Sequence, residues 1–176
     1  MTAFDEHADL DDPAFRLLSN SAVTLFWRAT VLEDTVGALR AHGYQIVRLN
    51  ASGWTADDRM HDDVSAALGF PSYYGRNLDA LNDCLADVVA GDYGWEPDST
   101  GLVLVLIGYD VFATQRRTSA QVMLDVVARR SREALLIGRR LLCLVQSDDP
   151  TIEFDGVGST PVVWNPAEWL ASRRQP

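Results

Sequence analysis

Apolar and polar residues alternate along this chain in blocks that predict strands and helices in turn. Short apolar runs with little internal polarity are typical of strands that are buried on both faces. Such runs occupy residues 23–28, 44–49, 102–106, 141–146 and 162–164. Segments with helical periodicity separate them, which predicts an α/β fold built on a small, mainly parallel sheet flanked by helices.

Helix start and stop signals mark the segments between these strands. Gly43 closes a helix over 32–41, and Asn77 is a good N-cap for a helix over 78–90. Asn165-Pro166-Ala167-Glu168 has the pattern of a capping box and predicts a terminal helix through Leu170. Further helices are expected over 56–68, 111–116 and 119–136, and the acidic segment 1–13 is expected to be a flexible tail.

The helix expected over 78–90 has two different faces. Leu78, Leu81, Leu85, Val88 and Val89 fall on one side, whereas Asp79, Asp83 and Asp87 recur every four residues on the other. Like charges at this spacing destabilise an isolated helix by about 0.2–0.5 kcal/mol per pair, so local stability does not explain them. The row is either a solvated helix face or a surface for a positively charged partner.

Charge is unevenly distributed along the chain, whose formal net charge is −10. Residues 61–100 carry eight acids and one arginine, whereas residues 101–176 carry eight acids and nine arginines. A field of this sign repels nucleic acid and attracts a basic protein. The acid is therefore concentrated around the row of aspartates.

Several other functional classes find little support in the sequence. The acidic start has no signal-peptide pattern, no run is long enough to span a membrane, and two cysteines favour reduced thiols in the cytoplasm. The three histidines are too scattered for a metal site, and Gly156-Val157-Gly158-Ser159 lacks the rest of a phosphate-loop pattern, so no metal or cofactor is expected. The arginines near 129–140 lack interleaved aromatics and are interpreted as a solvated face or internal counter-charges rather than a nucleic-acid site.

Three neighbouring motifs give a more specific signal. Tyr73-Tyr74-Gly75, Asn77-Leu78-Asp79-Ala80-Leu81 and Asp83-Cys84-Leu85 closely resemble the central segment of the barstar family of intracellular ribonuclease inhibitors, with a weaker echo at Leu102-Val103-Leu104 and Phe112. The resemblance covers about 44–147. It divides the single expected domain into a tail (1–13), an N-terminal βα extension (22–43), a barstar-like core (44–147) and a C-terminal strand-helix extension (148–176).

The resemblance implies a partner-binding site. In the family these positions plug the active site of a ribonuclease, with Asp83 at the phosphate position and Asp79 beside it. A carboxylate can do this because an Arg fork binds it as it binds phosphate. The implied contact residues are Tyr73, Gly75, Asn77, Leu78, Asp79, Asn82, Asp83 and Asp87.

Three positions depart from the family pattern. Asn82 stands where the family has tryptophan, Asp87 replaces a glycine, and Arg129 aligns near a family glutamate. The expected function is therefore a cytoplasmic immunity protein that binds a basic ribonuclease or a related nuclease toxin one to one. The alternative is an interaction module for a non-nuclease partner. An enzyme is disfavoured, because Asp79 and Asp83 have no accompanying nucleophile, metal or cofactor cradle.

Overall fold

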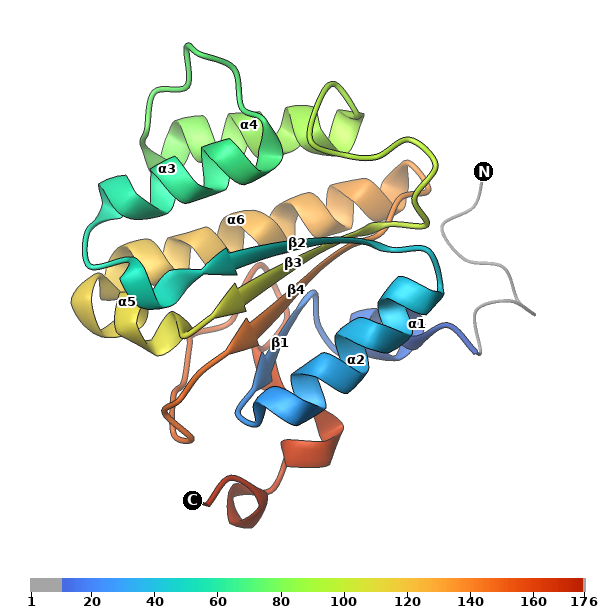
Figure 1. Cartoon of the computed structure of the whole chain (residues 1–176), viewed down its shortest axis with the longest axis vertical. Helices are drawn as coiled ribbons and strands as arrows, with labels where there is room; N and C mark the ends of the chain where they lie inside the picture. The colour runs from blue at the N-terminus through green and yellow to red at the C-terminus, as the bar shows by residue number, and fades with distance from the viewer. Residues whose placement is uncertain (1–10, 176) are drawn as a thin grey trace.

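A five-stranded parallel sheet forms the centre of the computed structural model, which describes residues 11–175 of the 176-residue chain (Figure 1). The strand order is β2-β3-β4-β1-β5, and each neighbouring pair is parallel. The strands are β1 (Val23–Phe26), β2 (Gln45–Asn50), β3 (Leu102–Ile107), β4 (Leu141–Gln146) and β5 (Val163–Trp164). The expected α/β class and parallel sheet are confirmed.

Helices cover both faces of this sheet, which explains why its central strands are almost uniformly apolar. Alternate residues of β3 enter different cores: Leu104 packs with one group of helices and Val105 with the other. The first core is covered by α3 (Asp57–Leu68), α4 (Leu78–Ala90), α5 (Tyr109–Gln115) and α6 (Arg117–Leu136). The second is covered by α1 (Pro13–Leu18) and α2 (Ala29–Ala41). The helix α4 packs against α6 at the edge of the first layer (Figure 1).

Both segments outside the barstar-like range add strands to the sheet. The N-terminal strand β1 pairs with β4, and the C-terminal strand β5 pairs with β1. The helix α2 connects β1 to β2, but β3 and β4 lie between those strands, so this βαβ connection crosses two strands. The expected extension of the sheet by the N-terminal strand is confirmed.

The predicted tail needs correction at its end. Residues 1–10 lie outside the described residues, but Asp12 is buried and its side chain accepts from the Ala14 amide at the start of α1. Its Oδ2 also accepts a hydrogen bond of 2.7 Å from the Tyr44 hydroxyl. An N-cap aspartate followed by proline at the first helical position explains this short helix.

The predicted C-terminal helix is also wrong in kind. Asn165 caps the segment as expected, with Oδ1 accepting from the Ala167 amide at 2.9 Å, but only the 3₁₀ turns η2 (Pro166–Glu168) and η3 (Ala171–Arg173) follow. Glu168 does not complete a capping box. Its carboxylate accepts the amides of Trp27 and Arg28, and β1 ends at Phe26 rather than at Arg28.

Candidate acidic interface on α4 and its preceding loop

The helix α4 has the predicted bounds because its local signals agree. Asn77 Oδ1 accepts the Ala80 amide at 2.8 Å at the N-terminus, and Gly91 ends the helix at a φ of +93°. Leu81, Leu85 and Val88 are buried against the first core, as their spacing predicts. The opposite face of α4 is left at the surface.

Two of the three aspartates on that face are exposed and unpaired. Within residues 11–175, neither Asp79 nor Asp83 has a hydrogen bond or an ion pair from its carboxylate. Asp87 is partly buried instead, and its Oδ2 accepts a hydrogen bond of 3.1 Å from the Tyr93 hydroxyl. Burial raises the pKa of Tyr93 far above its ordinary value, so this phenol stays protonated as a donor. Asp79 and Asp83 thus remain available to groups outside the chain.

The loop between α3 and α4 leads into the first turn of α4 and extends away from both helices (Figure 1). Tyr73, at 79% exposure, is among the most exposed large hydrophobic side chains of the described residues. Gly75 and Asn77 are exposed as well. Tyrosine is enriched among interface hot spots, so the exposed Tyr73 is the side chain of this loop best suited to anchor a partner.

Partly buried aromatic residues hold the base of this loop. The Tyr74 hydroxyl lies 2.5 Å from His61 Nδ1 on α3, and its ring meets Phe70 edge to face. His61 is 2% exposed, and burial lowers its pKa, so the neutral imidazole is favoured. The loop that carries Tyr73 is therefore attached to α3 through its neighbour Tyr74.

The eight predicted contact residues lie on this loop and on the helix that follows it. Five of them are exposed: Tyr73, Gly75, Asn77, Asp79 and Asp83. The other three are partly buried: Leu78, Asn82 and Asp87. Leu78 packs against the first core, and Asn82 Oδ1 is buried without a hydrogen-bond partner in the part of the chain described. Their roles toward a partner remain predictions.

Sequence reasoning missed the residues that adjoin this surface from α3. Asp58 and Asp62 face the loop residue Arg76, whose Nη2 lies 2.8 Å from Asp62 Oδ1. The available signal was that Arg76 is the one arginine among 61–100, in a chain without lysine. Its partners could not be found from spacing alone, because they lie on a separate helix.

The arginines near the end of α6 bind groups of their own chain. Arg140 Nη1 donates to Asp12 and to the Tyr44 hydroxyl, and Arg130 pairs with Glu133. Arg139 donates to the Val89 carbonyl oxygen at 2.5 Å and lies over the ring of the buried Trp95. These contacts fit the predicted role of internal counter-charges.

Residues 11–175 hold no group of three or more His, Cys, Asp or Glu side chains that could bind a metal. Over the same residues, no helix combines the length and the apolarity needed to cross a bilayer.

The parallel α/β sheet, with the exposed acidic helix α4 and the motif loop before it, indicates a barstar-like α/β protein. A family model described as Barstar (barnase inhibitor) matches residues 44–146, so the chain belongs to the barstar family. It is also similar to the Bacillus subtilis (strain 168) protein named "Putative ribonuclease inhibitor YrdF", with 39% identity over 74 residues. That alignment covers 42% of this chain and 71% of the relative. The matched family range corresponds closely to the resemblance found in the sequence.

Proposed function

We propose that this protein inhibits a basic ribonuclease, or a related nuclease toxin, by inserting its acidic surface into the active site. Family membership and the name of the Bacillus relative support ribonuclease inhibition. The observation that carries the proposal is the pair of exposed carboxylates, Asp79 and Asp83, which no group among residues 11–175 neutralises. A protein that leaves two acids one helical turn apart without counter-charges is suited to a cationic partner.

In this mechanism Asp83 takes the place of the substrate phosphate. Its carboxylate accepts hydrogen bonds from the arginine, lysine or histidine side chains that would otherwise bind RNA. Asp79 adds a second charge about 6 Å along the helix axis, from a rise of 1.5 Å per residue. The inhibitor blocks the cleft by occupying it. It is not consumed, because it has no phosphodiester bond that the nuclease can cleave.

The remaining contact residues shape the interface around this pair. Tyr73, Gly75 and Asn77 approach from the loop, and Leu78, Asn82 and Asp87 form the edge along α4. Aromatic anchors such as Tyr73 contribute most when they enter a pocket that excludes water. The segment 61–100, with eight acids and one arginine, also attracts a basic partner before contact.

Protection of a cell that makes such a nuclease requires an inhibitor in the same cell, and we place this protein in the bacterial cytoplasm as an immunity protein. Both of its cysteines, Cys84 and Cys143, are buried free thiols. One acidic surface per chain implies a one-to-one complex. The proposed activity is binding, without catalysis by this chain.

A titration of RNA cleavage tests the proposal. Wild-type protein is added to barnase and to a panel of other basic secreted ribonucleases, and cleavage of a fluorogenic RNA is followed. We expect stoichiometric inhibition of at least one nuclease. The Asp83→Ala variant should bind at least 30-fold more weakly, since an interface hot spot contributes about 2 kcal/mol or more.

A matched control separates the local contact from net charge. Asp34 is an exposed aspartate on α2, which covers the opposite face of the sheet. Asp34→Ala removes the same charge and should inhibit as the wild type does. Equal affinity of Asp83→Ala and wild type would refute the role of Asp83.

A second candidate function is an interaction module for a partner that is not a nuclease. The C-terminal extension favours it, because Trp169 and Leu170 are each 59% exposed there. This alternative predicts that Trp169→Ser abolishes capture of the natural partner, whereas Asp83→Ala does not. The ribonuclease-inhibitor proposal predicts the reverse.

A further inference from the structure

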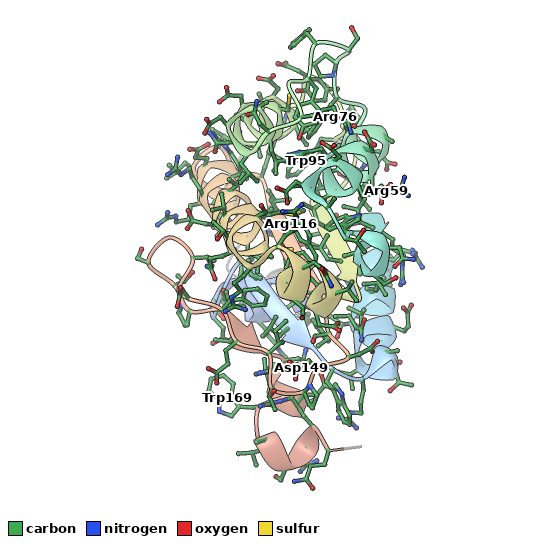
Figure 2. The ribbon with its side chains drawn as sticks, turned by 90° about the vertical axis from the view of Figure 1, so that its left-hand side faces the viewer. Arg59, Arg76, Trp95, Arg116, Asp149 and Trp169 are labelled. Atoms are coloured by element: carbon green, nitrogen blue, oxygen red, sulfur yellow. The ribbon has the colours of Figure 1, made fainter. Side chains whose placement is uncertain are left out.

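We infer that Arg76 is a positioning residue that holds the contact loop in its binding conformation and offsets part of the charge of Asp58 and Asp62 on α3. The inference rests on the proposed function for its binding half. Arg76 lies between Gly75 and Asn77, two of the predicted contact residues. Its own side chain turns toward α3, where it meets Asp62, and Figure 2 labels Arg76 near the end of the molecule that carries this loop.

The backbone of Arg76 is unusual. Its φ is +50°, and it is the one non-glycine residue with a positive φ among residues 11–175. A long side chain rarely adopts this left-handed conformation without compensating contacts. The conformation makes the chain turn between Tyr73 and the Asn77 cap of α4. It therefore determines where the exposed Tyr73 side chain lies relative to the start of α4.

Compensating contacts converge on the guanidinium from one stretch of α3. Arg76 Nη2 lies 2.8 Å from Asp62 Oδ1 and 3.8 Å from Asp58 Oδ1, and it donates to the Asp58 carbonyl oxygen at 3.3 Å. His61, between these two aspartates, contacts Tyr74 on the other side of Gly75. One turn of α3 therefore holds the loop at two positions.

These contacts also direct the charge of the surface. Asp58 and Asp62 would otherwise compete with α4 for a cationic partner. Arg76 offsets one of these two charges, whereas Asp79 and Asp83 have no ion pair among the described residues, so the balance of negative charge shifts toward α4. A partner approaching this end of the molecule is drawn toward α4 rather than α3.

The role is local, because the Arg76 and Asp62 side chains are about half exposed, at 47% and 48%. Ion pairs with this exposure contribute little to global stability. Loss of Arg76 should therefore leave the melting temperature within about 3 °C while it releases the loop. An ordered loop favours binding because its ordering cost is met before the partner arrives.

Two variants distinguish this role from a general charge effect. Arg76→Asn removes the guanidinium but keeps a residue type that tolerates the left-handed conformation. Arg59→Gln removes an equal charge from an exposed arginine of α3 that has no ion pair within the described range (Figure 2). Both changes remove one positive charge, so a difference between the two variants reports the contacts of Arg76 with α3 rather than net charge.

The first readout needs no nuclease. Amide hydrogen exchange of residues 72–77 is measured in the free protein. We expect exchange in Arg76→Asn to be at least threefold faster than in wild type, and exchange in Arg59→Gln to be unchanged. Unchanged loop exchange in Arg76→Asn would overturn the inference, whatever the protein binds.

The second readout is dissociation from a ribonuclease that the wild type inhibits. Arg76→Asn should dissociate about three- to tenfold faster, the scale expected from one or two side chains that lose their order. Asp62→Asn should have a similar effect, and the double variant should be no worse than either single variant. Additive losses would overturn the inference, since they would mean that Arg76 contacts the nuclease directly.

The two proposals fail in different ways. If wild-type protein inhibits no ribonuclease while Arg76→Asn still releases the loop, the nuclease proposal fails and the attachment of the loop to α3 is supported. If inhibition occurs but amide exchange of the loop is the same in wild type and Arg76→Asn, the nuclease proposal is supported and the positioning role of Arg76 fails.

Discussion

Two carboxylates of this chain have opposite surroundings. Glu168, which is fully buried, accepts hydrogen bonds from the amides of Trp27 and Arg28 at 2.9 and 2.8 Å and from Arg28 Nε at 3.1 Å. Asp83 is exposed on α4 and has no such donor among residues 11–175. The same functional group thus attaches one segment of the fold and is left free in another.

The difference separates acids that stabilise the folded state from acids that do not. A carboxylate can be buried only where donors replace the water that it loses. Asp12 belongs with Glu168, because it is buried and bonded to Tyr44 and Ala14. Asp79 belongs with Asp83. Their exposure without counter-charges indicates that folding does not require them. Substitutions at Glu168 and Asp83 test this division, and substitutions at Asn77 and His61 test the contacts that hold α4 and the loop before it.

The largest effect is expected at Glu168. Glu168→Ala removes the acceptor of two backbone amides and should lower the free energy of unfolding by about 3 kcal/mol. A hydrogen bond to a charged group contributes about 1.5–3 kcal/mol, and the amides left behind lose their partner. Urea unfolding measures it. Glu153→Ala, at an exposed glutamate of the same extension, should change stability by less than about 0.5 kcal/mol. Equal effects of the two substitutions would contradict the division.

A smaller loss is expected at the cap of α4. Asn77→Ala removes the acceptor of the Ala80 amide and should destabilise the protein by about 1 kcal/mol. Asn77→Asp keeps a side chain that caps well and should preserve most of the stability. If both variants lose the same stability in urea unfolding, the cap does not explain where α4 begins.

Asp83→Ala should change stability in the other direction. It removes like-charge repulsion with Asp79 and Asp87, and alanine has the higher helix propensity, so the protein should gain roughly 0.5–1 kcal/mol. The same variant should lose inhibition. A loss of stability in thermal or urea unfolding would show that Asp83 serves the fold and would remove the contrast with Glu168.

The smallest effect concerns pH and the buried imidazole under the contact loop. Burial lowers the pKa of His61, whereas Asp57, Asp58 and Asp62 oppose that shift. The unfolded chain therefore takes up a proton near pH 6.5 that the folded protein resists, and stability falls as the pH decreases below that value. The stability difference between wild type and His61→Gln should decrease from pH 7.5 to pH 5.5. A difference independent of pH would mean that His61 titrates alike in both states.

Local signals in the sequence predicted much of this molecule. The bounds of α4 follow from the Asn77 cap, the apolar spacing and Gly91, and the apolar strands follow from burial on both faces. The acidic face of the same helix was visible for the same reason. Each of these features depends on residues a few positions apart.

Contacts between distant segments could not be predicted in this way. Glu168 and the Trp27 amide are 141 residues apart, and nothing in the capping-box pattern distinguishes this use of Glu168 from a helix start. The strand order β2-β3-β4-β1-β5 also depends on pairing between strands that are far apart in the sequence. The partnership of Arg76 with Asp62 likewise depends on how two helices lie side by side.

Competition with a substrate analogue tests the central claim most directly. A single-stranded DNA oligonucleotide lacks the 2′-hydroxyl needed for cleavage, so it can occupy the active site of an inhibited ribonuclease without reacting. We predict that the apparent dissociation constant of the wild-type inhibitor rises in proportion to the oligonucleotide concentration, because Asp83 and a phosphate need the same site. An affinity that stays constant while the oligonucleotide saturates the nuclease would contradict phosphate mimicry.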